Sequence, residues 1–150
     1  NVYNKLENST KSEEVFSKLI SLEPGNKDHY FYFGKALMEA GKYSQARTQF
    51  LKASDVGNGW ALPIFYEGFL YEQSAGGCTD FDRKVVYLLA QNTYRRALNM
   101  DPNLGEARDR INALSGSVPT KEDYFFRNIK SGTVIPITCV GWIGKSVTAP

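Results

Sequence analysis

The sequence predicts an all-α protein built from pairs of short helices joined by tight turns. Three observations support this fold class: apolar residues recur at helical spacing, glycine or proline ends each periodic run, and one pattern returns further along the chain. The clearest pair covers residues 30–53. A pair this short cannot bury its apolar face alone, so further pairs are expected beside it.

The central pair has one small-residue position on each helix. Gly34 on the first helix and Ala46 on the second lie where a large side chain would hold the helices apart. Gly41 ends the first helix, because glycine takes the left-handed cap conformation without strain. The residues at helical spacing in the two helices are Tyr30, Phe33, Gly34, Leu37, Tyr43, Ala46, Phe50 and Ala53.

The same pattern recurs after a fixed interval. Gly68 lies 34 residues after Gly34, whereas Ala90 lies 44 residues after Ala46. The recurring residues are Ile64, Gly68, Tyr71, Ala90, Tyr94, Ala97 and Pro102. This pattern resembles the tetratricopeptide repeat, whose period is 34 residues. The resemblance covers roughly residues 11–114 and implies a tetratricopeptide-like helical hairpin array, a right-handed α-solenoid.

The extra residues of the second repeat form a glycine-rich link. Residues 74–80 are a loop by composition. Gly76, Gly77, Asp80 and Asp82 make this unit similar to Sel1-like repeats, which have a longer period and such a link. Both resemblances imply the same architecture.

The remaining helices have recognisable ends. Ser12 is the expected N-cap of the first helix, which stops before Pro24. A break at residues 57–59 precedes a helix over about 60–73, with Pro63 in its first turn. Further helices are expected over about 81–100 and 104–114.

The character of the chain changes after Ser115. Thr120 and Asp123 have the spacing of a capping box at the start of a short helix. Residues 133–140 are rich in β-branched side chains and predict an extended segment, which Pro136 restricts to a sheet edge. The sequence therefore predicts a repeat domain over residues 1–114 and a C-terminal helix with a short extended tail over residues 115–150.

Composition limits the partners and the compartment. A net charge of +2 gives no argument for nucleic acid, and no apolar run is long enough to span a membrane. Cys78 and Cys139 are compatible with a disulfide or with two ordinary thiols. The compartment stays open between an exported bacterial protein whose signal has been removed and the cytoplasm, and the oligomeric state stays open too.

The sequence offers no set of catalytic or cofactor-binding residues. Gly144-Lys145-Ser146 ends like a phosphate-binding loop, but Cys139 stands where that motif needs its first glycine. His29 is the one histidine, so no histidine cluster for a metal is available. We therefore expect no catalysis, no cofactor and no metal.

Binding is the function that the resemblance implies. In tetratricopeptide repeats the first helix of each pair lines a concave groove. The groove positions predicted to bind a peptide are Phe31, Lys35, Met38, Leu62, Phe65, Phe69 and Glu72. These side chains are mostly apolar and suit an apolar peptide or an amphipathic helix of an unidentified protein partner. Only Lys35 and Arg108 suit an anion, which argues against a clamp for a C-terminal carboxylate.

Two alternatives to a partner-binding scaffold remain at this stage. In the first, the chain is a self-capped structural domain whose groove is filled by its own tail. The candidate side chains for that filling are Tyr124, Phe125, Ile135 and Trp142. In the second, the chain is a regulatory module of a larger protein.

Overall fold

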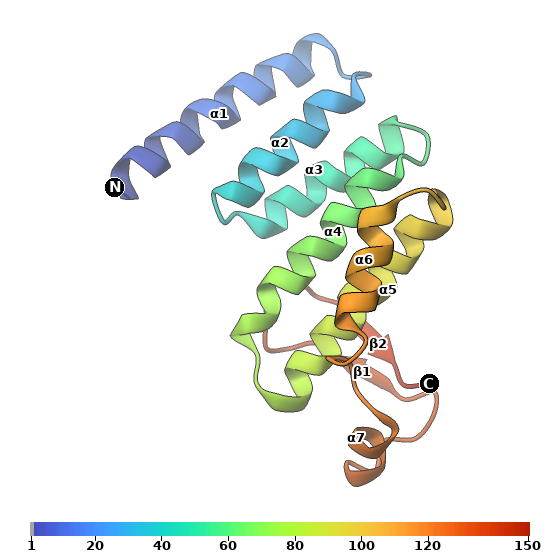
Figure 1. Cartoon of the computed structure of the whole chain (residues 1–150). Helices are drawn as coiled ribbons and strands as arrows, with labels where there is room; N and C mark the ends of the chain where they lie inside the picture. The colour runs from blue at the N-terminus through green and yellow to red at the C-terminus, as the bar shows by residue number, and fades with distance from the viewer. Residues whose placement is uncertain (1) are drawn as a thin grey trace. The chain divides into compact units, whose positions relative to one another are not determined.

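The described chain is mostly helical, as the sequence predicts. The computed structural model describes residues 2–150, with side chains from Glu7 onward. Its elements are α1 (Val2–Leu22), α2 (Lys27–Glu39), α3 (Tyr43–Val56), α4 (Ala61–Ser74), the 3₁₀ turn η1 (Ala75–Gly77), α5 (Asp80–Met100), α6 (Gly105–Leu114), α7 (Lys121–Phe126), β1 (Val134–Pro136) and β2 (Ser146–Thr148) (Figure 1).

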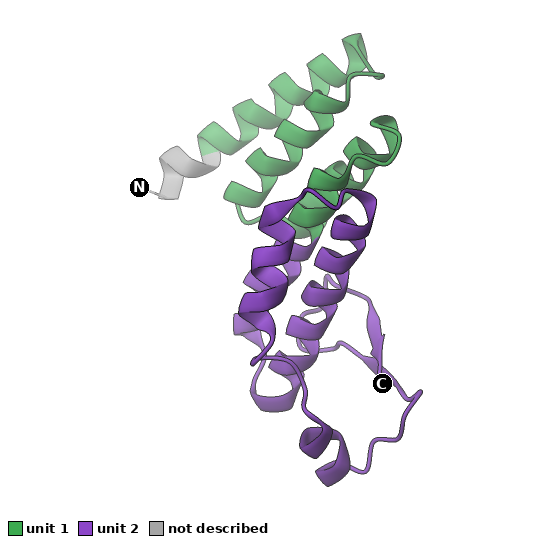
Figure 2. Cartoon of the chain, turned by 45° about the vertical axis from the view of Figure 1, so that its right-hand side comes forward, with its two compact units in different colours: residues 1–67 green, residues 68–150 purple. Residues whose placement is uncertain are grey.

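The chain forms two compact units. Unit 1 is residues 1–67 and unit 2 is residues 68–150, and α4 contributes residues to both (Figure 2). The boundary predicted between residues 114 and 115 falls inside unit 2.

In unit 1, α2 and α3 form the predicted hairpin. Tyr30, Leu37, Ala46, Phe50 and Ala53 are all buried in it. A Cβ atom added at Gly34 would lie 2.7 Å from two ring carbons of Phe50. The two helices can approach this closely because Gly34 has no side chain.

The turn between α2 and α3 is built as predicted. Gly41 has a φ of +78°, which favours glycine. Its N–H donates to the Met38 carbonyl, and the Lys42 N–H donates to the Leu37 carbonyl. These two bonds satisfy carbonyls at the end of α2 that would otherwise lack donors.

The first helix is longer than predicted. α1 runs without interruption to Leu22, so the N-cap predicted at Ser12 is wrong. Polar side chains in the preceding turns stabilise the helix along its surface: Lys11 pairs with Glu7 at 3.0 Å, and the Ser9 hydroxyl donates to Glu13. The predicted stop before Pro24 is confirmed.

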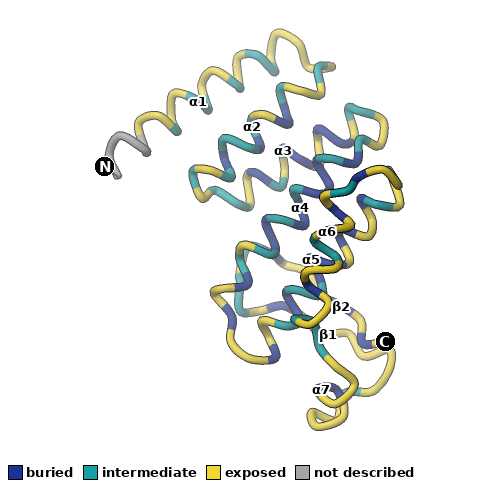
Figure 3. Tube along the Cα trace, in the orientation of Figure 1, coloured by how far each residue is buried: buried dark blue, intermediate teal, exposed yellow. Residues whose placement is uncertain are grey.

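Unit 2 repeats the close approach seen in unit 1. A Cβ atom added at Gly68 on α4 would lie 2.8 Å from the Tyr94 ring on α5. Tyr94 is fully buried, as are Leu70 and Tyr71 on α4. Along α5 many positions are buried, whereas α7 and the residues that follow it are mostly exposed (Figure 3).

In the C-terminal part of unit 2, the predicted start of α7 is confirmed, whereas the strand β2 was not predicted. The capping box of Thr120 and Asp123 is present at the start of α7. β1 pairs antiparallel with β2, with Ile135 opposite Val147. The extended segment around Pro136 was predicted, but its partner strand β2 was predicted only as part of a tail.

The two cysteines form a disulfide, which settles the alternative that the sequence left open. Cys78 follows η1 and Cys139 follows β1, and their Cα atoms are 5.4 Å apart. The bond therefore connects the link between α4 and α5 to the C-terminal part of unit 2.

Candidate functional site

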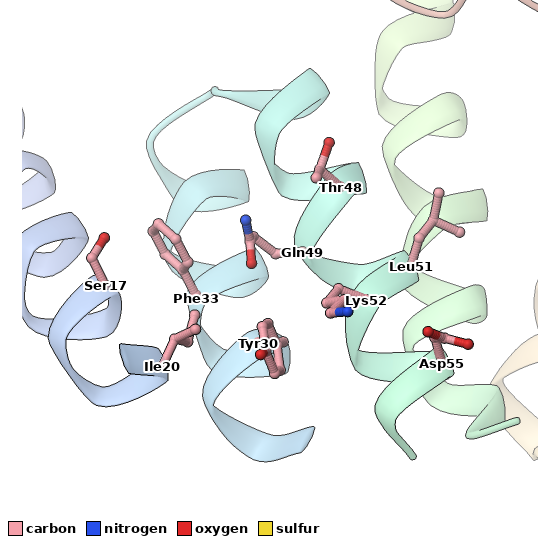
Figure 4. Close-up of a pocket in the computed structure, with 9 residues that line it drawn as sticks. All are labelled: Ser17, Ile20, Tyr30, Phe33, Thr48, Gln49, Leu51, Lys52 and Asp55. Carbon is pink, nitrogen blue, oxygen red and sulfur yellow. The ribbon is translucent and has the colours of Figure 1, made fainter. Parts of the chain in front are cut away.

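A pocket of about 550 Å³ opens in unit 1 over the hairpin of α2 and α3 (Figure 4). We call it the unit 1 pocket. Its lining residues are Ser17, Ile20, Tyr30, Phe33, Thr48, Gln49, Leu51, Lys52 and Asp55. They come from α1, α2 and α3, so three helices that are neighbours in the chain build the whole pocket.

Aromatic and aliphatic side chains form the apolar part of the pocket. Phe33 on α2 stacks on Phe16 of α1, with ring centroids 5.6 Å apart. The Tyr30 hydroxyl donates to the Pro24 carbonyl at 2.7 Å, which fixes the ring at the start of α2. Ile20 adds an aliphatic group from α1 (Figure 4). Because Phe33 and Tyr30 are held by these contacts, the apolar wall is largely preformed.

The helix α3 supplies the other wall, which is mostly polar. Leu51 is 39% exposed and is the apolar side chain on this wall. Lys52 and Asp55 are exposed, and neither forms an ion pair within the described part of the chain. The pocket thus combines an apolar interior with one cation and one anion at its edge, a composition suited to an amphipathic partner.

A further ion pair joins α1 to the hairpin. The Lys42 ammonium, at the start of α3, pairs with the Glu13 carboxylate on α1. Since α1 supplies Ser17 and Ile20 to the pocket, this contact helps to hold that wall in place.

The predicted groove residues of unit 1 belong largely to an aromatic cluster. Phe31 is buried among the rings of Phe50, Trp60 and Tyr66, with centroids 4.9–5.9 Å away. The Lys35 ammonium lies 5.5 Å from the Tyr66 ring centroid, a cation–π contact.

The other groove residues of unit 1 differ in their exposure. Phe65 is also buried, whereas Met38 and Leu62 are half-buried. Phe31 and Phe65 are therefore not presented to solvent, and their predicted contact with a peptide stays a prediction.

Glu72, predicted to face the groove, instead joins three helices of unit 2. Its carboxylate accepts from the Tyr94 hydroxyl at 2.6 Å and forms an ion pair with Arg110 on α6. The hydrogen bond to Glu72 raises the pKa of Arg110. The pKa of Tyr94 is also raised, mainly because the hydroxyl is buried and secondly because it donates a hydrogen bond to the Glu72 carboxylate. Phe69 is half-buried in unit 2, and the binding role of both residues stays a prediction.

The proposed tail fillers have different surroundings. The Tyr124 ring is buried and meets Phe81 edge to face, and Trp142 stacks on Tyr71 at 5.7 Å. Ile135 is half-buried. Phe125 is 79% exposed, so it fills no groove in the described chain.

None of the nine pocket residues is among the seven predicted peptide-binding residues. The sequence pattern assigned Tyr30 and Phe33 to the core, and the exposed residues of α3 had no signal that set them apart from an ordinary solvated face. The space over α2 depends on how far apart α1 and α3 lie, and helical periodicity carries no information on that distance.

Other side chains with chemical potential are engaged in local contacts. His29 lies 3.3 Å from the Glu23 carboxylate, and hydrogen bonds from Asn26 and His29 lower the pKa of Glu23. Arg108 donates to the Pro102 carbonyl. Within the described residues, no three His, Cys, Asp or Glu side chains are grouped so as to hold a metal ion. None of the described helices is long and apolar enough to cross a membrane.

Comparison with known proteins adds no family assignment. No family model matches the chain, and no curated protein matches it either.

Proposed function

We propose that this chain is a non-catalytic protein–protein interaction domain, a scaffold or adaptor built from tetratricopeptide-like hairpins. The observation that carries this proposal is the unit 1 pocket, which offers an apolar wall, a charged edge and about 550 Å³ of space. The partner is a protein that inserts an apolar side chain from a peptide or amphipathic helix into the pocket.

The repeat architecture is supported by the recurrence of one contact. Gly34 meets Phe50 in unit 1 and Gly68 meets Tyr94 in unit 2, and each glycine lies on the first helix of its hairpin. The two glycines are 34 residues apart, the period of the tetratricopeptide repeat. This recurrence favours two hairpins of the same design, stacked in a right-handed α-solenoid.

Binding in the pocket follows from its composition. Burying a Leu or Phe side chain contributes roughly 1.5–3 kcal/mol, which is the size of an interface hot spot. Lys52 and Asp55 at the edge select a partner with charges of both signs beside that anchor. The pocket wall contains no histidine, cysteine or paired carboxylates, and this composition favours binding over catalysis.

Affinity capture from the source cell tests the proposal. Leu51→Asp places a charge at the pocket, and Leu22→Asp is the matched control, because Leu22 is an apolar residue that is 71% exposed and lies outside the pocket. We expect Leu51→Asp to lose the captured protein while Leu22→Asp keeps it. Equal recovery by both variants would refute a role for the pocket, and loss with Phe69→Ala alone would favour the predicted groove.

A self-capped structural domain is the second candidate. The stack of Trp142 on Tyr71 favours it, because the tail then covers part of α4 in its own chain. Cutting the chain at Ser115 separates the candidates: a shortened domain that stays soluble and gains affinity for apolar peptides would show that the tail was a plug. A shortened domain that unfolds would show that the tail belongs to the core.

The disulfide also bears on the compartment. Disulfides form and persist in oxidising compartments and are rare in the cytosol. The bond between Cys78 and Cys139 therefore favours the exported alternative over the cytoplasmic one.

A further inference from the structure

Residues 132–149, which we call the tail segment, lie within unit 2 and pack on its helices through four buried apolar side chains. Ile137, Ile143, Val147 and Ala149 are each at most 7% exposed. Between them, Trp142 stacks on the Tyr71 ring of α4, and β2 contacts α5. The segment therefore covers apolar surface of both helices.

The backbone structure of the tail segment is small. β1 and β2 have three residues each, and the adjoining bonds run from Gly132 to Ala149, from Ala149 to Thr133 and from Ile137 to Lys145. A two-stranded hairpin of this size is marginally stable at best when isolated. Its order thus depends on its contacts with α4 and α5 and on the disulfide that joins Cys139 to Cys78.

The disulfide links two residues that are 61 positions apart in the sequence, so it closes a long loop that ends in the tail segment. When the bond is closed, Cys139 stays beside Cys78, so a tail segment that detaches is returned to its surface. When the bond is open, the tail segment is covalently connected to α5 through the chain that runs over α6 and α7. The ion pair of Lys84 with Asp123 holds α7, but no described ion pair holds the tail segment itself.

We propose that the disulfide of Cys78 and Cys139 is a thiol-dependent latch on the tail segment. Reduction releases the segment and uncovers the Tyr71 ring of α4, on which Trp142 stacks in the oxidised chain. The tail segment shares no residue with the unit 1 pocket, so the latch stands or falls independently of the proposed function.

The reductant is a dithiol, and the exchange is balanced. Cys139 is less buried than Cys78, so its sulfur is the one that a dithiol thiolate attacks. The bond between the two cysteine sulfurs breaks, Cys78 leaves as a thiolate and takes a proton, and a mixed disulfide forms on Cys139. The second thiol of the reductant then displaces Cys139, which also takes a proton, while the dithiol becomes a cyclic disulfide.

Amide hydrogen exchange on the full chain, with and without dithiothreitol, tests the latch. We expect exchange in residues 132–149 to be at least roughly tenfold faster after reduction. Exchange in α2 and α3 should stay unchanged, and residues 85–94 of α5 should keep their protection. The Cys78→Ser/Cys139→Ser double variant should behave like the reduced chain without any reductant. Phe126→Ser is the matched control, because Phe126 is 82% exposed.

Two results would overturn the latch. If the tail segment exchanges at the same rate in oxidised and reduced chains, the disulfide does not control it. If α5 loses protection together with the tail segment, the segment belongs to the core and is not released. Neither result would affect the capture experiment with Leu51→Asp, so the two proposals fail separately.

Discussion

The contact between Gly34 and Phe50 yields the most direct structural prediction. In Gly34→Val, the new Cβ would lie 2.7 Å from two ring carbons of Phe50 and 3.1 Å from a third. Ordinary carbon contacts are about 3.5–4.0 Å, so the ring must move or the helices must separate. Phe50 is 0% exposed, which leaves the ring no solvent to move into.

The expected loss of stability follows from two opposing terms. Overpacking in a buried site costs about 1–3 kcal/mol, and two added methyl groups place this variant toward the upper end. Replacing glycine by valine in a helix recovers less than about 0.5 kcal/mol of helix propensity. We expect Gly34→Val to lower the free energy of unfolding of unit 1 by about 2 kcal/mol.

Urea unfolding followed by circular dichroism measures this change. Gly105→Val is the matched control, because a Cβ added at Gly105 meets no atom within 4 Å. Adding Phe50→Leu to Gly34→Val should restore part of the loss, with a coupling of at least about 0.5 kcal/mol in a double-mutant cycle. If Gly34→Val is as stable as Gly105→Val, the close packing of α2 on α3 is refuted.

One titration and one variant test further contacts in unit 2. The pKa of Asp123 is lowered to about 2, first by the hydrogen bond from the Thr120 backbone N–H and then by the one from Lys84 of α5. The ionised carboxylate therefore stabilises α7 above the usual aspartate pKa, and this stabilisation is lost as the pH falls toward 2. A carboxyl titration by NMR with a midpoint near 4 would contradict it. Tyr94→Phe removes a hydroxyl that donates to a carboxylate on α4, and we expect a loss of about 1 kcal/mol; an unchanged unfolding midpoint would show that this bond adds nothing.

Local sequence signals were sufficient for the helices. Gly41 and Pro24 act within one turn of the chain, so their effects on helix ends could be predicted from neighbouring residues alone. The apolar spacing around Gly34 and Gly68 likewise identified which faces are buried. The prediction of an N-cap at Ser12 failed because serine, although a good capping residue, is also tolerated inside a helix. Here the turns around Ser12 form their own side-chain contacts.

Contacts between distant residues were beyond local signals. The pairing of Cys78 with Cys139 and the strand opposite Ile135 depend on how the chain returns on itself after α7. Glu72 sits at a helical position that suits a groove, yet an arginine of α6 captures it. The unit 1 pocket depends on the separation of α1 and α3, a quantity that no residue pattern encodes.

Site-specific photo-crosslinking in the source cell tests the binding account most directly. A photoreactive amino acid at Thr48, inside the unit 1 pocket, should yield a covalent adduct with one protein, and adding Leu51→Asp should abolish that adduct. The same group at Leu22, outside the pocket, should yield none. Identical adducts from both positions, or an adduct at Thr48 that survives Leu51→Asp, would contradict the account.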